Sequence, residues 1–248
     1  MSPHRASAAR ARRTKPLPAL AVFARTPTPG KAKTRLIPLL GPRGAAEFHA
    51  ALLSDTLRKV NALGGRASPY FYLAGGKYPA SSSLLDYTRR RQHGSDLGQR
   101  LERAFRELLR RHTRALVIGT DSPTLPERVV LQALHELDDC DAVLGPCPDG
   151  GFYLIGLRRP ADGAFEGVRW GSDLAFEDIR SNLAARNFSC SILKPLPDVD
   201  RPEDVERLKK ELAASRAARR LAPYAWKFLR EFFVLKGRRQ TAERSKAR

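Results

Sequence analysis

Short apolar runs alternate with longer amphipathic stretches along most of the chain. The apolar runs cover residues 20–23, 69–74, 115–119, 141–145, 151–157 and 188–193. They contain few polar positions, which is typical of strands that are covered on both faces of a parallel sheet. Between them, apolar residues recur at helical spacing over 44–63, 96–111, 126–137, 173–185 and 202–214. This alternation predicts a single Rossmann-like α/β domain, with a mostly parallel sheet and helices on both faces.

Ligands of such sheets bind where the parallel strands end. The loops after residues 23, 119, 145 and 193 are therefore expected to converge. These loops also hold most of the unusual residues of the chain, so the pattern places one binding site at this edge of the sheet.

Charge is concentrated at the two ends. The 248 residues carry a formal net charge of +19, of which residues 1–16 hold +5 and residues 215–248 hold +9. We expect a basic disordered tail over 1–16, the α/β domain over 17–214, and a basic amphipathic helical extension over 215–248. In the extension, one helical face carries positions 225, 228, 229, 232 and 233. Such a helix can lie on an anionic membrane surface; the alternative is packing on its own domain or on a second copy.

The cysteines and the apolar content favour a cytoplasmic protein. Cys140, Cys147 and Cys190 are odd in number and lack C-x-x-C spacing, which argues against a disulfide framework or a structural zinc site. All three are interpreted as small buried hydrophobes. The apolar run over 17–24 is short and contains Pro18, so we do not interpret it as a signal peptide. The protein would reach the inner face of the membrane only if the extension binds lipid.

The first strand runs into a loop that is suited to a phosphate or diphosphate. Residues 22–36 read VFARTPTPGKAKTRL. Gly30 lets the backbone approach an anion closely, and Lys31, Lys33 and Arg35 supply positive charge. The alternative is a basic surface loop, since the stretch is neither a P-loop nor a dinucleotide fingerprint.

Acidic residues follow two later strands. Asp121, beside Thr120 in GTDSPTLP, suits Mg²⁺ or Mn²⁺ at a strand end, although it could instead cap the next helix. Asp198 and Asp200 in LPDVDRPEDV alternate, so an extended backbone would point them to opposite sides and only one would face a metal. Asp200 could also serve as a helix cap.

Three further loops supply pocket candidates. In GPCPDGGFYLIG, Asp149 could orient a sugar hydroxyl or bind metal while Gly150 and Gly151 allow close approach; the same residues also predict a hairpin turn. Trp170 could stack on a ring or simply join the core. The loop QHGSDLGQRL contributes Gln92, Gly94 and Arg100.

These loops, in this order, resemble a bacterial family of nucleotide-diphospho-sugar transferase-like proteins, which includes glycosyltransferases associated with arsenosugar biosynthesis and with radical-SAM/selenodomain proteins. The resemblance runs from about residue 20 to residue 208. It rests on FARTPTPGKAKTRLIPLLG, SDTL, DLGQRL, IGTDSPTLP, LGPCPDGGFYLIGL and DVDRPEDVERL. It implies a GT-A-like fold and a transferase domain over 17–214.

The resemblance also implies roles for individual residues. Asp121 would be the principal ligand of a divalent metal (Mg²⁺ or Mn²⁺), with Asp198 or Asp200 as the second, and the sugar or acceptor would lie against Asp149, Gly150, Gly151 and Trp170. The expected catalytic residues are Asp121, Asp149, Lys33 and Arg35. The expected nucleotide and diphosphate contacts are Phe23, Ala24, Gly30, Lys31, Lys33, Arg35, Gln92, Gly94, Arg100 and Thr120.

Three functions remain open at this stage. The first is a metal-dependent glycosyltransferase that uses a nucleotide-diphosphate sugar and an unidentified small acceptor. The second is a nucleotidyltransferase that moves a nucleotide from an NTP to a phosphorylated small molecule. The third is a basic protein that binds nucleic acid or a membrane surface. No specific nucleic acid is expected, because the central domain lacks an interleaved basic and aromatic stripe.

Overall fold

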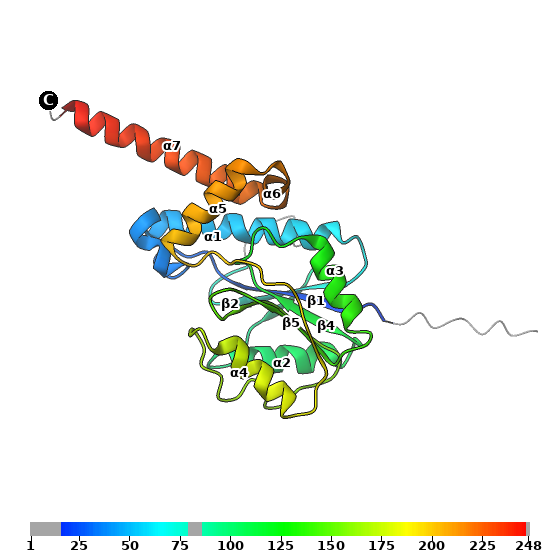
Figure 1. Ribbon diagram of the computed structural model, residues 1–248. Coiled ribbons are helices and arrows are strands. Elements are labelled where there is room, and N and C mark those ends of the chain that lie inside the picture. Colours follow the sequence, from blue (N-terminus) through cyan, green and yellow to red (C-terminus); the bar gives the residue numbers. More distant parts are fainter. Residues whose placement is uncertain (1–15, 79–85, 247–248) are drawn as a thin grey trace, which may run out of the picture.

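A seven-stranded sheet forms the centre of the domain (Figure 1). The computed structural model describes residues 16–78 and 86–246, with side chains up to residue 235. The predicted tail over 1–16 therefore lies almost wholly outside the described residues. The strands are β1 (Ala19–Arg25), β2 (Ser68–Ala74), β3 (Thr88–Arg91), β4 (Ala115–Ile118), β5 (Ala142–Pro146), β6 (Phe152–Leu157) and β7 (Cys190–Ile192).

The sheet is mostly parallel, as predicted. Its strand order is β3-β2-β1-β4-β6-β5-β7, and among the described strands β6 alone runs antiparallel to its neighbours. The strand β3 was not predicted, because its sequence TRRR has no apolar pattern. It lies at the edge of the sheet, where charged residues are common because they discourage pairing with another chain.

Helices cover both faces of the sheet, which confirms the predicted α/β class (Figure 1). The helices are α1 (Ile37–Ala62), α2 (Leu97–Leu109), α3 (Glu127–Glu136), α4 (Ala175–Ala184), α5 (Pro202–Ala214), α6 (Arg216–Leu221) and α7 (Pro223–Lys246), and a 3₁₀ turn spans Thr34–Leu36. Alternate residues of β1 divide between two cores: Leu20 and Val22 face α1 and α3, whereas Ala21 and Phe23 face α2 and α4.

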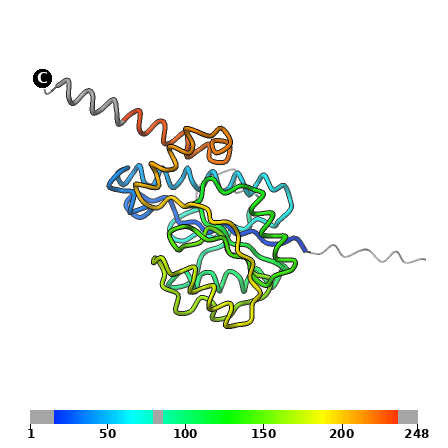
Figure 2. The backbone as a smooth tube through the Cα atoms, viewed as in Figure 1, coloured from blue at the N-terminus to red at the C-terminus, as the bar shows by residue number. Residues whose placement is uncertain are grey.

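The C-terminal extension packs on its own domain. Figure 2 shows the chain after α5 turning back over α1. Ala225 and Leu229 of α7 are buried in a third cluster with Phe48 and Leu52 of α1, and the Phe228 ring lies 5.3 Å from that of Phe48. The face predicted for a membrane is therefore the face that α7 turns toward α1. None of the described helices is long and apolar enough to cross a bilayer.

Asp55 of α1 ties the two helices together. Its carboxylate accepts the backbone N–H groups of Tyr224 and Ala225 at 3.0 and 2.9 Å, which are free donors at the start of α7. The Asp55 side chain is fully buried, and burial raises its pKa to about 6 even though these two hydrogen bonds oppose the shift. Asp55 thus takes the place of a local cap for a helix 169 residues further along the chain.

Replacing Asp55 by Ala should destabilise the fold by about 1–3 kcal/mol, because two buried N–H groups lose their acceptor. Urea denaturation at neutral pH measures this loss. The control is Glu47→Ala on the same helix, which removes an exposed ion pair with Arg43 and should change stability by no more than about 0.5 kcal/mol. Equal stability of the two variants would contradict the capping role.

Candidate functional site

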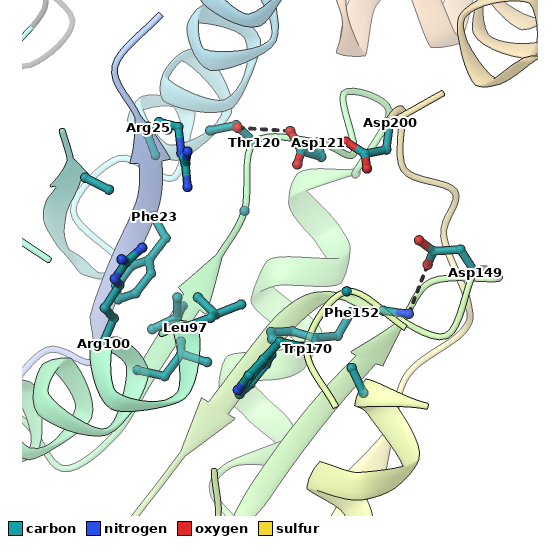
Figure 3. A pocket seen from close by; sticks show the side chains of 18 of the residues that line it. Phe23, Arg25, Leu97, Arg100, Thr120, Asp121, Asp149, Phe152, Trp170 and Asp200 are labelled. Atoms are coloured by element: carbon teal, nitrogen blue, oxygen red, sulfur yellow. Dashed lines mark hydrogen bonds between the residues drawn. The ribbon is translucent and has the colours of Figure 1, made fainter. Parts of the chain in front are cut away.

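A cavity of about 750 Å³ opens at the edge where β1, β4 and β5 end (Figure 3). It is bounded by the ends of β1 and β4, the β5–β6 hairpin, the start of α2 and the loop before α4. The loops that were expected to converge do meet here. Of the residues proposed from the sequence, those that line the cavity are Phe23, Ala24, Arg35, Gln92, Arg100, Thr120, Asp121, Asp149, Gly151, Trp170 and Asp200.

The remaining candidates lie outside its lining: Gly30, Lys31, Lys33, Gly94, Gly150 and Asp198. Lys31 lines a neighbouring cavity of about 450 Å³ instead. Arg25 and Arg100 border both cavities, so the two form adjoining spaces with cations between them. Gly94 accepts a hydrogen bond from the Arg100 guanidinium at 3.0 Å and so helps to aim that side chain.

Lys33 is buried between two of the acidic loops. Its ammonium group lies 2.8 Å from Asp121 and 3.2 Å from Asp200, and it donates a 2.6 Å hydrogen bond to the carbonyl of Val199. Burial lowers the pKa of Lys33, but Asp121 and Asp200 outweigh burial and the net shift is upward. The Lys33 charge is therefore directed at carboxylates, whereas the sequence interpretation directed it at a diphosphate.

The two acidic residues of the 198–200 loop have different partners. Asp200 binds Lys33 and Arg35, and these cations lower its pKa against the opposing effect of burial. Asp198 makes no ion pair with the described residues. Its pKa rises to about 6, through burial first and then the negative charges of Asp149 and Asp121. As the predicted alternation requires, the two carboxylates have different neighbours: Asp200 contacts the cations of the first loop, and Asp198 lies beside Asp149 and Cys147.

The β5–β6 hairpin is held by its glycines. Gly150 has φ +83°, and a Cβ there would lie 1.9 Å from the carbonyl oxygen of Asp173, so the close approach of this loop to the start of α4 requires glycine. Asp149 lines the cavity and accepts the N–H of Gly151 at 2.9 Å, which fixes one of its carboxylate oxygens. The predicted hairpin is confirmed, and its turn lines the cavity.

Gln92 presents an acceptor to the cavity. Its amide nitrogen donates to the carbonyls of Ala24 and Tyr72 at 3.1 and 3.0 Å. These bonds use both amide hydrogens, so the amide oxygen remains available to a donor in the cavity. Trp170 also lines the cavity, half-buried, with its ring 6.4 Å from that of Phe152 in an edge-on arrangement. Trp170 therefore both packs against the core and lines the cavity.

His49 is a lining residue that the sequence did not suggest. It belongs to α1, is 5% exposed, and its Nε2 lies 2.9 Å from the carbonyl oxygen of Arg25. Because a carbonyl only accepts, Nε2 carries the hydrogen, and Nδ1 is a buried acceptor that no described residue satisfies. Burial lowers the pKa of His49, which keeps the ring neutral. No motif in the sequence marks this residue, since only the fold brings α1 beside the end of β1.

The carboxylates at the acidic end of the cavity and the nearby Cys147 thiol are possible ligands of a divalent ion. Asp121 and Asp200 share the Lys33 ammonium and Asp200 also binds Arg35, so two cations balance these two carboxylates. Asp149 and Asp198 have no such partner among the described residues, and oxygen atoms of both lie within 4.8 Å of each other and of the Cys147 sulfur. A cation therefore fits the acidic end of the cavity on the side of Asp149 and Asp198.

Comparisons with known proteins agree with this architecture. A family model described as an uncharacterized protein conserved in bacteria (DUF2064) matches residues 65–172. A crystal structure from Desulfovibrio desulfuricans G20, provisionally named a nucleotide-diphospho-sugar transferase, is 28% identical and covers 88% of this chain and 95% of its own, with a TM-score of 0.77. No match was found among curated proteins.

More distant structures share the fold. A 2-C-methyl-D-erythritol 4-phosphate cytidylyltransferase from Thermus thermophilus is 16% identical over 80% of this chain and 100% of its own, with a TM-score of 0.51. The corresponding synthase from Anaerococcus prevotii, 10% identical, covers 79% of this chain and 96% of its own at a TM-score of 0.51. The expected resemblance to proteins of this kind and the expected fold are confirmed.

The Lys33 ion pairs give a pH-dependent prediction. The pKa of Asp200 is lowered, so its ion pairs stabilise the fold at pH values above the ordinary Asp pKa of 3.8. The pKa of Lys33 is raised, so its ion pairs stabilise the fold at pH values below the ordinary Lys pKa of 10.5. Lys33→Met should cost about 1–3 kcal/mol at pH 7, and the difference from wild type should shrink as the pH falls below 3.8. Urea denaturation at several pH values measures it.

The matched control is Lys31→Met, which removes an exposed cation two residues earlier in the same loop. It should leave stability within about 0.5 kcal/mol of wild type at every pH. A Lys33 variant that behaves like this control would show that the buried ion pairs contribute nothing.

Proposed function

We propose that this protein is a transferase that binds a nucleotide-diphosphate sugar in the 750 Å³ cavity and passes the sugar to a small acceptor. The observation that carries the proposal is the polarity of the cavity. Two cations, Arg25 and Arg100, line one part of the cavity, carboxylates including Asp121 and Asp149 line another, and aromatic side chains also line it. Arg35 belongs to the acidic part, because it is paired with Asp200. The similar structure from D. desulfuricans carries the corresponding name.

The residues of the cavity suit the parts of such a donor. The arginines neutralise a diphosphate, the free oxygen of Gln92 accepts an N–H from a nucleobase, and Trp170 offers a face to a ring. Asp149, which lines the cavity, is the best candidate to orient the acceptor and remove its proton. The acceptor oxygen would then attack the anomeric carbon as the bond to the diphosphate breaks.

A divalent ion, when bound at the acidic end, would neutralise the charge that develops on the departing diphosphate. Asp121 contributes its own charge there. One of its oxygens binds Lys33 while the side chain remains 45% exposed toward the cavity. Metal dependence, a cytoplasmic location and contact of the extension with lipid remain predictions.

Nucleotidyl transfer is a second candidate, favoured by the adjoining cavity. That space is lined by Arg25, Lys31 and Arg100 and by no acidic residue among those described. It suits the phosphate of a phosphorylated acceptor placed next to an NTP in the main cavity. The products separate the two reactions, because glycosyl transfer releases a nucleoside diphosphate and nucleotidyl transfer releases pyrophosphate.

Asp121→Asn should lower turnover by about a hundredfold or more while the protein stays folded, because its carboxylate lies near enough to Asp198 to add to the negative field that would hold a divalent cation at the departing diphosphate. The donor is found first, by thermal shift with Mn²⁺ and a panel of nucleotide sugars and NTPs, since a bound ligand raises the melting temperature. Turnover is then measured as release of nucleoside diphosphate.

The matched control is Asp139→Asn, an exposed carboxylate after α3 that should keep wild-type turnover. A fully active Asp121 variant would refute the assigned role of this carboxylate. Stabilisation by an NTP together with pyrophosphate release would replace the first candidate by the second, and no stabilisation by any ligand would count against both.

A further inference from the structure

Three side chains of types that bind metal ions lie close together beside the acidic end of the cavity. Of the three, Asp149 lines the cavity itself. Cys147 follows β5, Asp149 lies in the hairpin turn, and Asp198 precedes α5. The Cys147 sulfur and one carboxylate oxygen from each aspartate all lie within 4.8 Å of one another. They come from two loops about 50 residues apart, and the fold holds those loops side by side through the 3.1 Å hydrogen bond from Leu196 N–H to the Pro146 carbonyl.

The charges in this region are unequally balanced. Lys33 lies between Asp121 and Asp200, and Arg35 adds a second cation to Asp200 at 2.7 Å. Asp149 and Asp198 form no ion pair within the described ranges. Asp198 is partly buried and Asp149 is exposed, and carboxylates this close together repel one another unless a cation joins them. The missing positive charge therefore belongs beside Asp149 and Asp198, and Lys33 already fills the space between the other two.

A second observation points to a ligand at the same place. Cys147 is 7% exposed, so its thiol is buried against the carboxylates. Burial and the nearby Asp198 and Asp149 carboxylates raise the pKa of this thiol, and the neighbouring Ser122 hydroxyl lowers it in part, although it does not reach the sulfur with the geometry of a normal hydrogen bond. The Ser122 oxygen is itself buried, and in this structure it makes no hydrogen bond with a described residue. A buried hydroxyl without a partner, next to a buried thiol, is expected where a group is still to be bound.

We propose that Cys147, Asp149 and Asp198 form the divalent cation site of this protein, and that it selects a borderline ion such as Zn²⁺ or Co²⁺ over Mg²⁺. A thiolate is a soft ligand that binds such ions well, whereas Mg²⁺ prefers oxygen ligands and octahedral geometry. Three protein ligands leave a coordination position open, as in sites that act on a substrate. Asp149 also lines the cavity, so that position lies at its edge.

This site deepens the proposed function, since the ion would lie beside the diphosphate of the proposed donor. It also changes the expected roles. Once Asp149 binds the ion, it orients the acceptor and no longer serves as its general base. Asp198 remains a ligand, while Asp121 and Asp200 act as the partners of Lys33. Cys147, interpreted from the sequence as a small buried hydrophobe, becomes a ligand. Because the ion binds side chains of the protein alone, its binding can be measured with no nucleotide present.

The test is a titration of the full-length protein with Co²⁺, followed by absorption spectroscopy. Cobalt bound to a thiolate gives a charge-transfer band in the near ultraviolet that oxygen ligands do not produce. The wild-type protein should show this band with one equivalent of Co²⁺. Zn²⁺ should abolish it by displacement, and a large excess of Mg²⁺ should leave it in place.

Two variants locate the sulfur. Cys147→Ser should lose the band, whereas Cys190→Ser, which alters a half-buried cysteine on β7 outside the cluster, should keep it. Asp198→Asn should weaken Co²⁺ binding at least about tenfold while the band remains at saturation. Circular dichroism confirms that each variant is folded.

Absence of the band in the wild-type protein, or its persistence in folded Cys147→Ser, would overturn the proposal. So would displacement of Co²⁺ by Mg²⁺ at equal concentration, because that indicates a site made of oxygen ligands. These outcomes do not depend on turnover. A protein that binds Co²⁺ through Cys147 but releases neither a nucleoside diphosphate nor pyrophosphate would keep the metal site and lose the proposed function.

Discussion

The buried ammonium of Lys33 is the interaction on which the site depends. It joins three loops that are far apart in the sequence: the loop after β1, the loop after β4 through Asp121, and the loop before α5 through Asp200 and the Val199 carbonyl. A second bond, from Val199 N–H to the Asp121 carbonyl at 2.8 Å, closes the same junction. Because the ammonium is 4% exposed, these contacts act in a region of low effective dielectric, where they are stronger than on the surface.

The backbone of Lys33 shows what this arrangement requires. Its φ and ψ are both 48°, a left-handed conformation that is uncommon for a residue with a side chain. Such a conformation persists only where the surroundings hold it, and here the two carboxylates and one carbonyl do so. The same geometry directs the neighbouring Arg35 to the cavity edge and leaves Lys31 exposed beside the second cavity. The three cations of this loop therefore occupy different places: Lys33 is buried among carboxylates, Arg35 lies at the cavity edge, and Lys31 borders the second cavity.

The sequence predicted the fold well because its signals are local. Apolar runs and helical periodicity located six of the seven strands and the helices that cover them. The strand β3 was not predicted, because its arginine-rich sequence has no apolar pattern. The sequence also identified the loops that meet at the cavity, since parallel strands end at one edge. It could not assign partners: the pairing of Lys33 with Asp121 and Asp200, and the approach of His49 to the end of β1, depend on contacts between distant segments. The packing of α7 on α1 likewise depends on Asp55, whose cap no helical pattern reveals.

The same reasoning explains why the acidic end of the cavity has two halves. Asp198 and Asp200 flank Val199, whose side chain is buried and fixes the strand-like alternation of the loop. Asp200 is thereby turned toward the cations of the first loop, and Asp198 toward the hairpin with Asp149 and Cys147. Lys33 and Arg35 supply two positive charges to the two carboxylates of the first half, so that half is balanced within the protein. The second half has no such cation among the described residues, and the proposed metal ion would supply its positive charge. The loops around Lys33 would then act as a fixed scaffold, while Asp149, which lines the cavity, would bring the exchangeable charge to the cavity edge.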